Sequence, residues 1–289
     1  MFFGLVLMKM DRRINIRVWP SSGELAVMLL ITALLSCAPQ GIRAAGTLPE
    51  ASEVTRRMIA RSQTVAQGDQ ETQYTYQKRS LLERLDADGH SLKSEEKIYQ
   101  VTLIGGFPFK RLVKIAGREL SLEELRKEET KDAKFRQTFV SDDRQKPGTR
   151  KEGLVTAELL DRYQFVVEKR VVLSNRPTLV LTFRPKAGDL PSRTIEDKLL
   201  NPMAGRLWID EEDADVARLE VSLMEPVFLG WFGLLGSLTQ CDVSLERRRM
   251  PDGVWINAKQ ALFIQCRKLT ATTRFRTTDK SSGFKKMVH

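Results

Sequence analysis

Histidine, the side chain that enzymes use most often for acid–base catalysis, is scarce in this chain of 289 residues. Histidine occurs only at His90, beside a turn glycine, and at His289, the last residue. A histidine-based triad and a multi-histidine metal site are therefore excluded. The sequence also has no nucleophile elbow of the Gly-x-Ser-x-Gly kind and no glycine-rich phosphate loop. A pair of carboxylates that cleaves glycosidic bonds needs only proximity in space, so the sequence does not exclude such a pair. We expect a protein that is not an enzyme and that holds no cofactor or metal.

Two runs of charge are the other candidates for a binding site. The acidic residues between Asp210 and Asp215 lack the glycine and the distal glutamate of an EF-hand calcium loop, so we expect a solvated turn. A run of three arginines follows at residues 247–249: Arg247, Arg248 and Arg249. Such a run could bind anionic lipid headgroups, but more often its like charges prevent another strand from pairing with a strand end.

The chain has three cysteines, Cys37, Cys241 and Cys266. The last two lie on alternating segments joined by a Pro-Asp-Gly turn at residues 251–253, which is typical of a hairpin. Pairing about this turn places Cys241 opposite Ile264 and leaves Cys266 one diagonal step away on the same face. That separation is too long for a disulfide unless a bulge intervenes. A disulfide between Cys241 and Cys266 and two buried free thiols are both compatible with the sequence.

The first 45 residues have the order of charge, short apolar run and small-residue exit that is typical of a secretory signal. The apolar run at residues 25–35 is well short of the roughly 20 residues that a spanning helix needs. Two cleavage sites fit. Cys37 follows Leu-Leu-Ser as in a bacterial lipobox, which predicts lipidation of Cys37 and an outer-membrane anchor. Ala45 follows Ile-Arg-Ala as at an ordinary signal-peptidase site, which predicts release into the periplasm.

The charge of the chain also limits its partners. The formal net charge is +10, and the basic residues are interspersed with Asp and Glu throughout. A nucleic-acid-binding protein would gather this charge on one face with aromatic side chains between, so we expect no nucleic-acid partner. An anionic membrane surface suits a mildly basic exported domain better.

Beyond the leader, the pattern predicts one helix followed by many strands. Residues 49–63 have the spacing of a short amphipathic helix. From residue 73 onward, alternating segments are separated by turn residues, which predicts an antiparallel meander. The predicted strands cover residues 73–85, 98–103, 109–115, 164–172, 178–184, 206–210, 216–223, 241–245 and 262–266. A sheet of about nine to eleven strands is expected to curl.

One charged stretch, near residues 121–150, interrupts the strands. Ser121 and Glu124 have the spacing of a capping box. The residues at 123–137 are almost wholly charged, which predicts a solvent-exposed helix. Charge, glycine and proline then dominate residues 141–151, which predicts a loop inside the domain. We expect a single domain over residues 46–289 with this stretch as a helical insertion.

An apolar segment at residues 227–238 has neither strict alternation nor helical spacing. It contains Phe228, Trp231 and Phe232 and is interrupted by glycines, so it does not fit a regular core strand. One interpretation is a lid over an apolar cavity or a loop that dips into a membrane. The other is a bulged, buried strand at a barrel corner, where glycine relieves curvature.

The hairpin at residues 205–220 reads Gly-Arg-Leu-Trp-Ile-Asp and then Val-Ala-Arg-Leu-Glu. It resembles the LolA/LolB lipoprotein-carrier superfamily and related bacterial outer-membrane lipoprotein-sorting proteins. The resemblance extends more loosely to the helix after the leader, the strand from Gln73 and the hairpin around Asn175. It implies a mainly β, α+β fold: a strongly curved, incomplete antiparallel β-barrel whose concave face is covered by helices and holds a hydrophobic cavity for acyl chains. The charged helix and the apolar segment depart from the carriers.

We therefore expect an exported, non-enzymatic protein that binds the acyl chains of a lipid or of a lipidated protein, in lipoprotein or lipid trafficking to the outer membrane. The alternative is an envelope-stress regulator or assembly scaffold that recognises a protein partner through the charged helix. The inward strand residues would line the cavity and the aromatic residues would form its entrance: Leu207, Ile209, Leu219, Val221, Val243, Leu262 and Ile264 in the cavity, with Phe228, Trp231 and Phe232 at the entrance.

Overall fold

The computed structural model describes residues 47–68, 74–104, 107–139, 157–188, 190–192, 194–229, 236–268 and 271–287. The chain divides into two units, Met1–Leu48 and Pro49–His289, and all the described helices and strands belong to the second. The predicted signal segment, with Cys37 and Ala45, lies outside the described residues. Among the described helices, none has the length and apolar character needed to cross a membrane.

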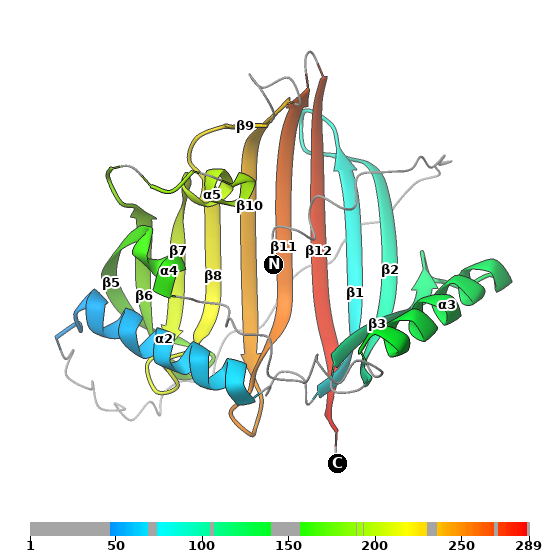
Figure 1. Cartoon of the computed structure of the whole chain (residues 1–289), viewed down its shortest axis with the longest axis horizontal. Helices are drawn as coiled ribbons and strands as arrows, with labels where there is room; N and C mark the ends of the chain where they lie inside the picture. The colour runs from blue at the N-terminus through cyan, green and yellow to red at the C-terminus, as the bar shows by residue number, and fades with distance from the viewer. Residues whose placement is uncertain are drawn as a thin grey trace, which may run out of the picture. The chain divides into compact units, whose positions relative to one another are not determined.

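Twelve antiparallel strands form one curved, open sheet (Figure 1). Its order is β4-β3-β2-β1-β12-β11-β10-β8-β7-β6-β5, and β9 pairs with β10 outside this path. The strands are β1 (Tyr74–Leu85), β2 (Ser91–Ile104), β3 (Phe107–Ile115), β4 (Arg118–Glu119), β5 (Tyr163–Leu173), β6 (Arg176–Pro185), β7 (Met203–Asp210), β8 (Val216–Leu223), β9 (Val227–Leu229), β10 (Gly236–Arg249), β11 (Trp255–Lys268) and β12 (Ala271–Lys286). The open, curved antiparallel sheet expected from the sequence is confirmed, with twelve strands instead of nine to eleven.

The last strand completes the sheet at its centre. β12 lies between β1 and β11, so that Thr277 is opposite Leu82 on one side and Leu262 on the other. This contact joins the meander of β1 to β4 with the strands from β5 to β11. The sheet is therefore continuous although its two halves come from opposite ends of the described chain (Figure 1).

The hairpin of β7 and β8 is confirmed: β8 has the predicted limits, and β7 ends as predicted but begins at Met203 instead of Arg206. It depends on a close backbone approach at Gly205, which lies opposite Val221. A Cβ atom at this position would be 1.9 Å from the backbone oxygen of Glu220. Any other residue would therefore separate the two strands.

Four described helices accompany the sheet: α2 (Ala51–Gly68), α3 (Leu122–Phe139), α4 (Ala157–Asp161) and α5 (Ile195–Leu200). Helix α2 lies across β5 to β8 (Figure 1). Val54 and Met58 of its apolar side pack in a core with Leu181, whose exposure is 0%. The amphipathic helix predicted after the leader is thus confirmed, and the sheet supplies the apolar surface that its sequence requires.

Candidate functional site

The cross-strand register brings predicted lining residues together on one face of the sheet. Leu207 of β7 lies between Leu181 of β6 and Leu219 of β8. Leu219 in turn lies opposite Leu245 of β10. Because side chains directly opposite one another in a sheet point to the same side, these four leucines form one apolar row across four strands.

Two neighbouring rows continue the same face. Val221 of β8 lies opposite Val243 of β10, and Val243 lies opposite Leu262 of β11. Two residues further along, Cys241 of β10 lies opposite Ile264 of β11. Ile209, two residues after Leu207 on β7, belongs to the same side. The seven predicted cavity residues therefore share one face, which we call the apolar face.

Helix α2 covers one half of the apolar face. Leu207 and Ile209 lie in the core cluster that includes α2 residues, with exposures of 6% and 1%. Leu219 and Val221 pack against the same cluster and are half-buried. This half is therefore a packed interior in which side chains of the protein contact each other.

The other half of the apolar face extends over β10 and β11. Val243, Leu262 and Ile264 are half-buried and are not members of the cluster beneath α2. Beyond them, Phe275 of β12 lies opposite Ile264 and is half-buried as well. The apolar face therefore continues past the edge of α2 and is partly accessible there.

The predicted entrance residues are only partly described. Phe228 of β9 is 67% exposed. Its neighbour Val227 is buried and lies opposite Leu238 of β10, so strand alternation directs Phe228 to the other side of β9. Trp231 and Phe232 lie outside the described residues.

The acidic turn between β7 and β8 differs from the solvated turn that the sequence predicts. Asp210 is 0% exposed and Asp215 is 7% exposed. Arg176 of β6 donates hydrogen bonds of 2.5 and 2.8 Å to the two oxygens of Asp210, and the backbone N–H of Asp213 donates to the same carboxylate at 2.8 Å. The solvated-turn prediction was wrong because the arginines that pair with these carboxylates come from strands distant in the sequence.

The arginine run at residues 247–249 supplies further partners. Arg247 forms an ion pair with Asp215 and donates to the backbone oxygen of Trp255 at 2.8 Å. Arg249 and the indole N–H of Trp255 both donate to Asp213, at 2.6 and 2.7 Å. Burial raises the pKa of Asp213, but these two hydrogen bonds and the positive charges of Arg249 and Arg176 together outweigh burial and lower the pKa. Neither like-charge repulsion nor headgroup binding accounts for Arg247 and Arg249, because both pair with the acidic turn.

The same turn also holds α2 on the sheet. Arg61 of α2 pairs with Asp215 at 3.2 Å, and Arg57 donates to the backbone oxygen of Glu211 at 2.7 Å. Arg170 of β5 holds the carboxylate of Glu211 at 2.7 and 2.9 Å. These contacts join α2, β5 and the acidic turn, so the turn carboxylates have a structural role beside the apolar face. The clustering of acidic residues in one turn and of arginines at the end of β10 was the sequence signal that could have indicated it.

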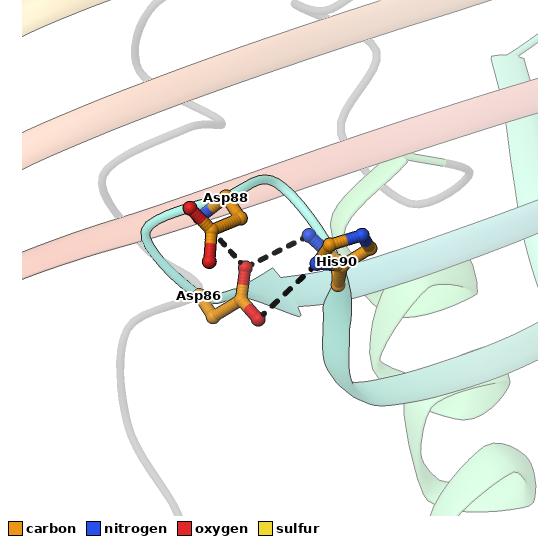
Figure 2. Close-up of side chains that lie close together, drawn as sticks. All are labelled: Asp86, Asp88 and His90. Carbon is orange, nitrogen blue, oxygen red and sulfur yellow. Dashed lines mark hydrogen bonds and ion pairs between the residues drawn. The ribbon is translucent and has the colours of Figure 1, made fainter.

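A second group of ionisable side chains lies at the turn between β1 and β2. Figure 2 shows Asp86, Asp88 and His90, whose potential ligand atoms lie within 4.8 Å of one another. Asp86 Oδ1 accepts hydrogen bonds of 2.9 Å from the backbone N–H groups of Asp88 and His90. The bond from His90 is the main reason that the pKa of Asp86 is below its usual range. These hydrogen bonds close the hairpin turn, which explains why the three side chains lie together. The expectation that the protein holds no metal stays a prediction.

The cysteine pair is placed as the turn at residues 251–253 predicts. Cys241 lies opposite Ile264, and Cys266 lies opposite Leu238 beyond a bulge in β10. Both are free thiols in this structure. Burial raises the pKa of Cys241 to about 12, so this thiol stays protonated and unreactive at neutral pH.

The predicted charged helix is α3, which lies beside the outer strand β3 (Figure 1). Most of its side chains are exposed, as the sequence predicts. Its inner side is different, because Asp132 is 8% exposed and forms an ion pair with Arg111 of β3. The ring of Phe135 lies 5.0 Å from the ring of Phe109.

Known family models and curated protein sequences give no match to this chain. A solved domain described as an outer membrane lipoprotein-sorting protein from Vibrio parahaemolyticus is 11% identical, covers 82% of this chain and 92% of its own length, and has a TM-score of 0.30. A LolA superfamily protein from Nitrosomonas europaea is 8% identical over 81% of this chain and 94% of that one, with a TM-score of 0.28. MucB from Pseudomonas aeruginosa, solved in complex with MucA, is 10% identical over 83% and 99%, with a TM-score of 0.24.

Proposed function

We propose that this chain is an exported, periplasmic, non-enzymatic protein that binds acyl chains of a lipid or of a lipidated protein on its apolar face. The observation that carries the proposal is the continuation of that face past α2, where Val243, Leu262 and Ile264 are half-buried. Each methylene removed from water contributes about 0.8 kcal/mol. About ten methylenes would therefore supply roughly 8 kcal/mol, enough for micromolar binding if ordering costs are small.

The charged groups support binding over catalysis. The carboxylates of the acidic turn are held by arginines, in the arrangement of an ion-pair network and not of an acid–base pair. The sequence resemblance of the hairpin at residues 205–220 to lipoprotein carriers adds a biological setting, the traffic of lipoproteins or lipids to the outer membrane. Lipidation at Cys37 would fix the protein to the membrane it serves.

Substitutions on the two faces of β11 test the proposal. Replacing Leu262 and Ile264 by Ser should weaken binding of a fluorescent long-chain fatty acid about tenfold or more, because two apolar contacts are lost. The matched control is Phe263→Ser, which lies between them on the opposite face and is also half-buried. Binding is measured by fluorescence titration, and the melting temperature of each variant is recorded. Equal weakening by the control variant would contradict a site on the apolar face.

The aromatic entrance is tested separately. The double substitution Trp231→Ser with Phe232→Ser should weaken binding of the same probe about tenfold with little change in melting temperature, if these rings contact the chain as a lid. A buried strand would behave differently, because two polar groups in a packed interior lower the melting temperature strongly. A collapse in stability would therefore favour the bulged-strand interpretation of this segment.

The second candidate is a scaffold that recognises a protein partner through α3. It is favoured by two exposed apolar side chains at the start of this helix, Leu122 at 77% and Leu125 at 44%. It becomes the leading account if the parent protein never binds an acyl probe.

A further inference from the structure

We propose that the outer edge of β3 binds an extended segment of a partner protein as an added β-strand, and that α3 occupies this edge until the partner displaces it. The proposal goes beyond acyl-chain binding and does not depend on it. In place of recognition by the exposed side of α3, it assigns α3 the role of a removable cover.

Among the strands that the structure describes, only β4 pairs with the outer edge of β3, and it does so over part of its length. The short strand β4 pairs with Lys114 and Ile115 alone. Further along, side chains of α3 bind the edge: Glu128 accepts a hydrogen bond of 3.0 Å from the backbone N–H of Leu112, and Lys131 donates one of 2.6 Å to the backbone oxygen of Lys110. Residues two apart present their backbone groups to the same neighbour, so these two side chains occupy the positions that a strand would take.

The side chains of the edge indicate what the partner must carry. Phe109 and Arg111 are two residues apart on β3 and therefore share a face. In this structure Phe135 of α3 packs on Phe109, and Asp132 of α3 pairs with Arg111. An added strand would replace both contacts if it carried an aromatic residue and an acidic residue two positions apart.

The attachment of α3 suits a cover that can move. Its contacts with β3 include the aromatic pair, the ion pair between Arg111 and Asp132, and the two bonds to the backbone of the edge. Arg111 is 53% exposed but Asp132 is buried, so displacement is favourable only if the partner supplies a replacement for this ion pair. The start of the helix is held at β4, away from residues 107–112 of β3, by two hydrogen bonds of 2.8 Å from Arg118 to Glu124 and by the bond from Ser121 N–H to the same carboxylate. Displacement can therefore occur by rotation about this end.

The opposite end of the sheet lacks these features. The edge strand β5 has a bulge between Val167 and Lys169, and its middle is charged. Bulges and charged side chains on an edge oppose the addition of another strand. Strand β3 also has a register shift in its pairing with β2 and charged residues such as Arg111, so the two ends differ in what contacts the edge. Of the two ends of the described sheet, only the β3 edge combines strand-like backbone partners with a defined pair of side-chain positions.

A peptide titration tests the proposal. The probe is a fluorescein-labelled peptide of the sequence Thr-Thr-Val-Phe-Thr-Asp-Val-Thr, and binding is followed by anisotropy. The double variant Glu128→Ala with Lys131→Ala, which frees the edge, should bind the probe at least tenfold more tightly than the parent. The matched control is Glu123→Ala with Lys127→Ala, a pair on the same helix that is 78% and 70% exposed. It should bind as the parent does. Equal affinity of the two double variants would overturn the proposal.

Two further measurements keep the test independent of how well the variant folds. On the parent protein, a saturating concentration of the probe should slow amide hydrogen exchange in residues 107–112. A probe that is N-methylated at alternate residues cannot form the strand ladder and should lose at least tenfold in affinity, as should a probe with Lys in place of Asp. Unchanged exchange in β3, or undiminished binding of the N-methylated probe, would contradict strand addition. Acyl-probe binding should be the same in all these variants, which separates this proposal from the proposed function.

Discussion

Arg247 of β10 and Asp215 of the acidic turn form an ion pair in which the two side chains are only 5% and 8% exposed. Asp215 also accepts a hydrogen bond of 3.2 Å from Arg61 of α2. One buried carboxylate thus connects the helix that covers the apolar face to a central strand of the sheet. The position of α2 over that face depends in part on this contact.

Removing the carboxylate should destabilise the protein strongly. Asp215→Ala leaves the Arg247 charge buried without its counter-ion, so we expect a loss of about 3–5 kcal/mol in the free energy of unfolding. The control is Glu246→Ala, because Glu246 and its partner Lys259 are each 45% exposed and such a pair contributes about 1 kcal/mol or less. Urea denaturation measures both variants. A loss for Asp215→Ala no larger than that of the control would show that the turn cluster does not hold the structure together.

Acid should remove a defined part of the stability through Asp197. Its pKa is lowered from the usual 3.8 to about 2, first by the hydrogen bond from the backbone of Thr194 and then by the bond from Arg162. A lowered pKa in the folded state means that the stabilisation is complete above the unfolded value and is lost as the pH falls through 3.8 towards about 2. Unfolding free energies between pH 5 and pH 2 should fall less steeply for Asp197→Asn than for the parent. If the free energy of unfolding fell equally steeply with pH in both proteins, Asp197 would not be a source of the acid sensitivity.

The two cysteines of the hairpin should be free. In the folded protein at pH 7.5, iodoacetamide should leave Cys241 unmodified, because burial raises its pKa to about 12. After unfolding without reductant, both Cys241 and Cys266 should react, and a sample reduced beforehand provides the control. Peptide mapping that found the two cysteines linked would establish the disulfide that the sequence also allows.

The sequence predicts strands well where one face of the sheet is buried. The alternation in residues 216–223 and the turn at residues 251–253 give β8 and the pairing of Cys241 with Ile264, because a strand with one apolar face has only one register that buries it. β12 was not predicted. Its residues are mainly Thr, Ser, Lys and Arg, so hydrophobic periodicity has little to detect, and its place between β1 and β11 is fixed by partners far away in the chain.

The candidate site follows the same rule. The shared face of Leu207, Leu219 and Val221 follows from alternation within β7 and β8 and from the short turn that pairs these two strands. The roles of Asp210 and Asp215 do not, since the sequence records the acidic turn but not that Arg176, Arg247 and Arg61 converge on it. Long-range ion pairs between strand ends leave no periodic pattern, which explains why the turn was expected to be solvated.

The lipobox-like sequence before Cys37 predicts where the protein is located. If Cys37 is lipidated, Cys37→Ala should move the protein from the membrane to the soluble periplasmic fraction while its circular dichroism spectrum stays the same. Fractionation followed by immunoblotting measures this, and a known periplasmic protein serves as the marker. A mature N-terminus at Ala45, or an unchanged membrane fraction, would rule out the lipid anchor.

Native mass spectrometry of the protein purified from membranes tests acyl-chain binding most directly. We predict that part of the protein carries an added mass, and that organic extraction of the same sample releases a molecule whose fragments identify a long acyl chain. The Leu262→Ser and Ile264→Ser double variant should lose this added mass, whereas Phe263→Ser should retain it. A parent protein that shows only its own mass, and that binds no fluorescent fatty acid when titrated, would contradict the acyl-binding account.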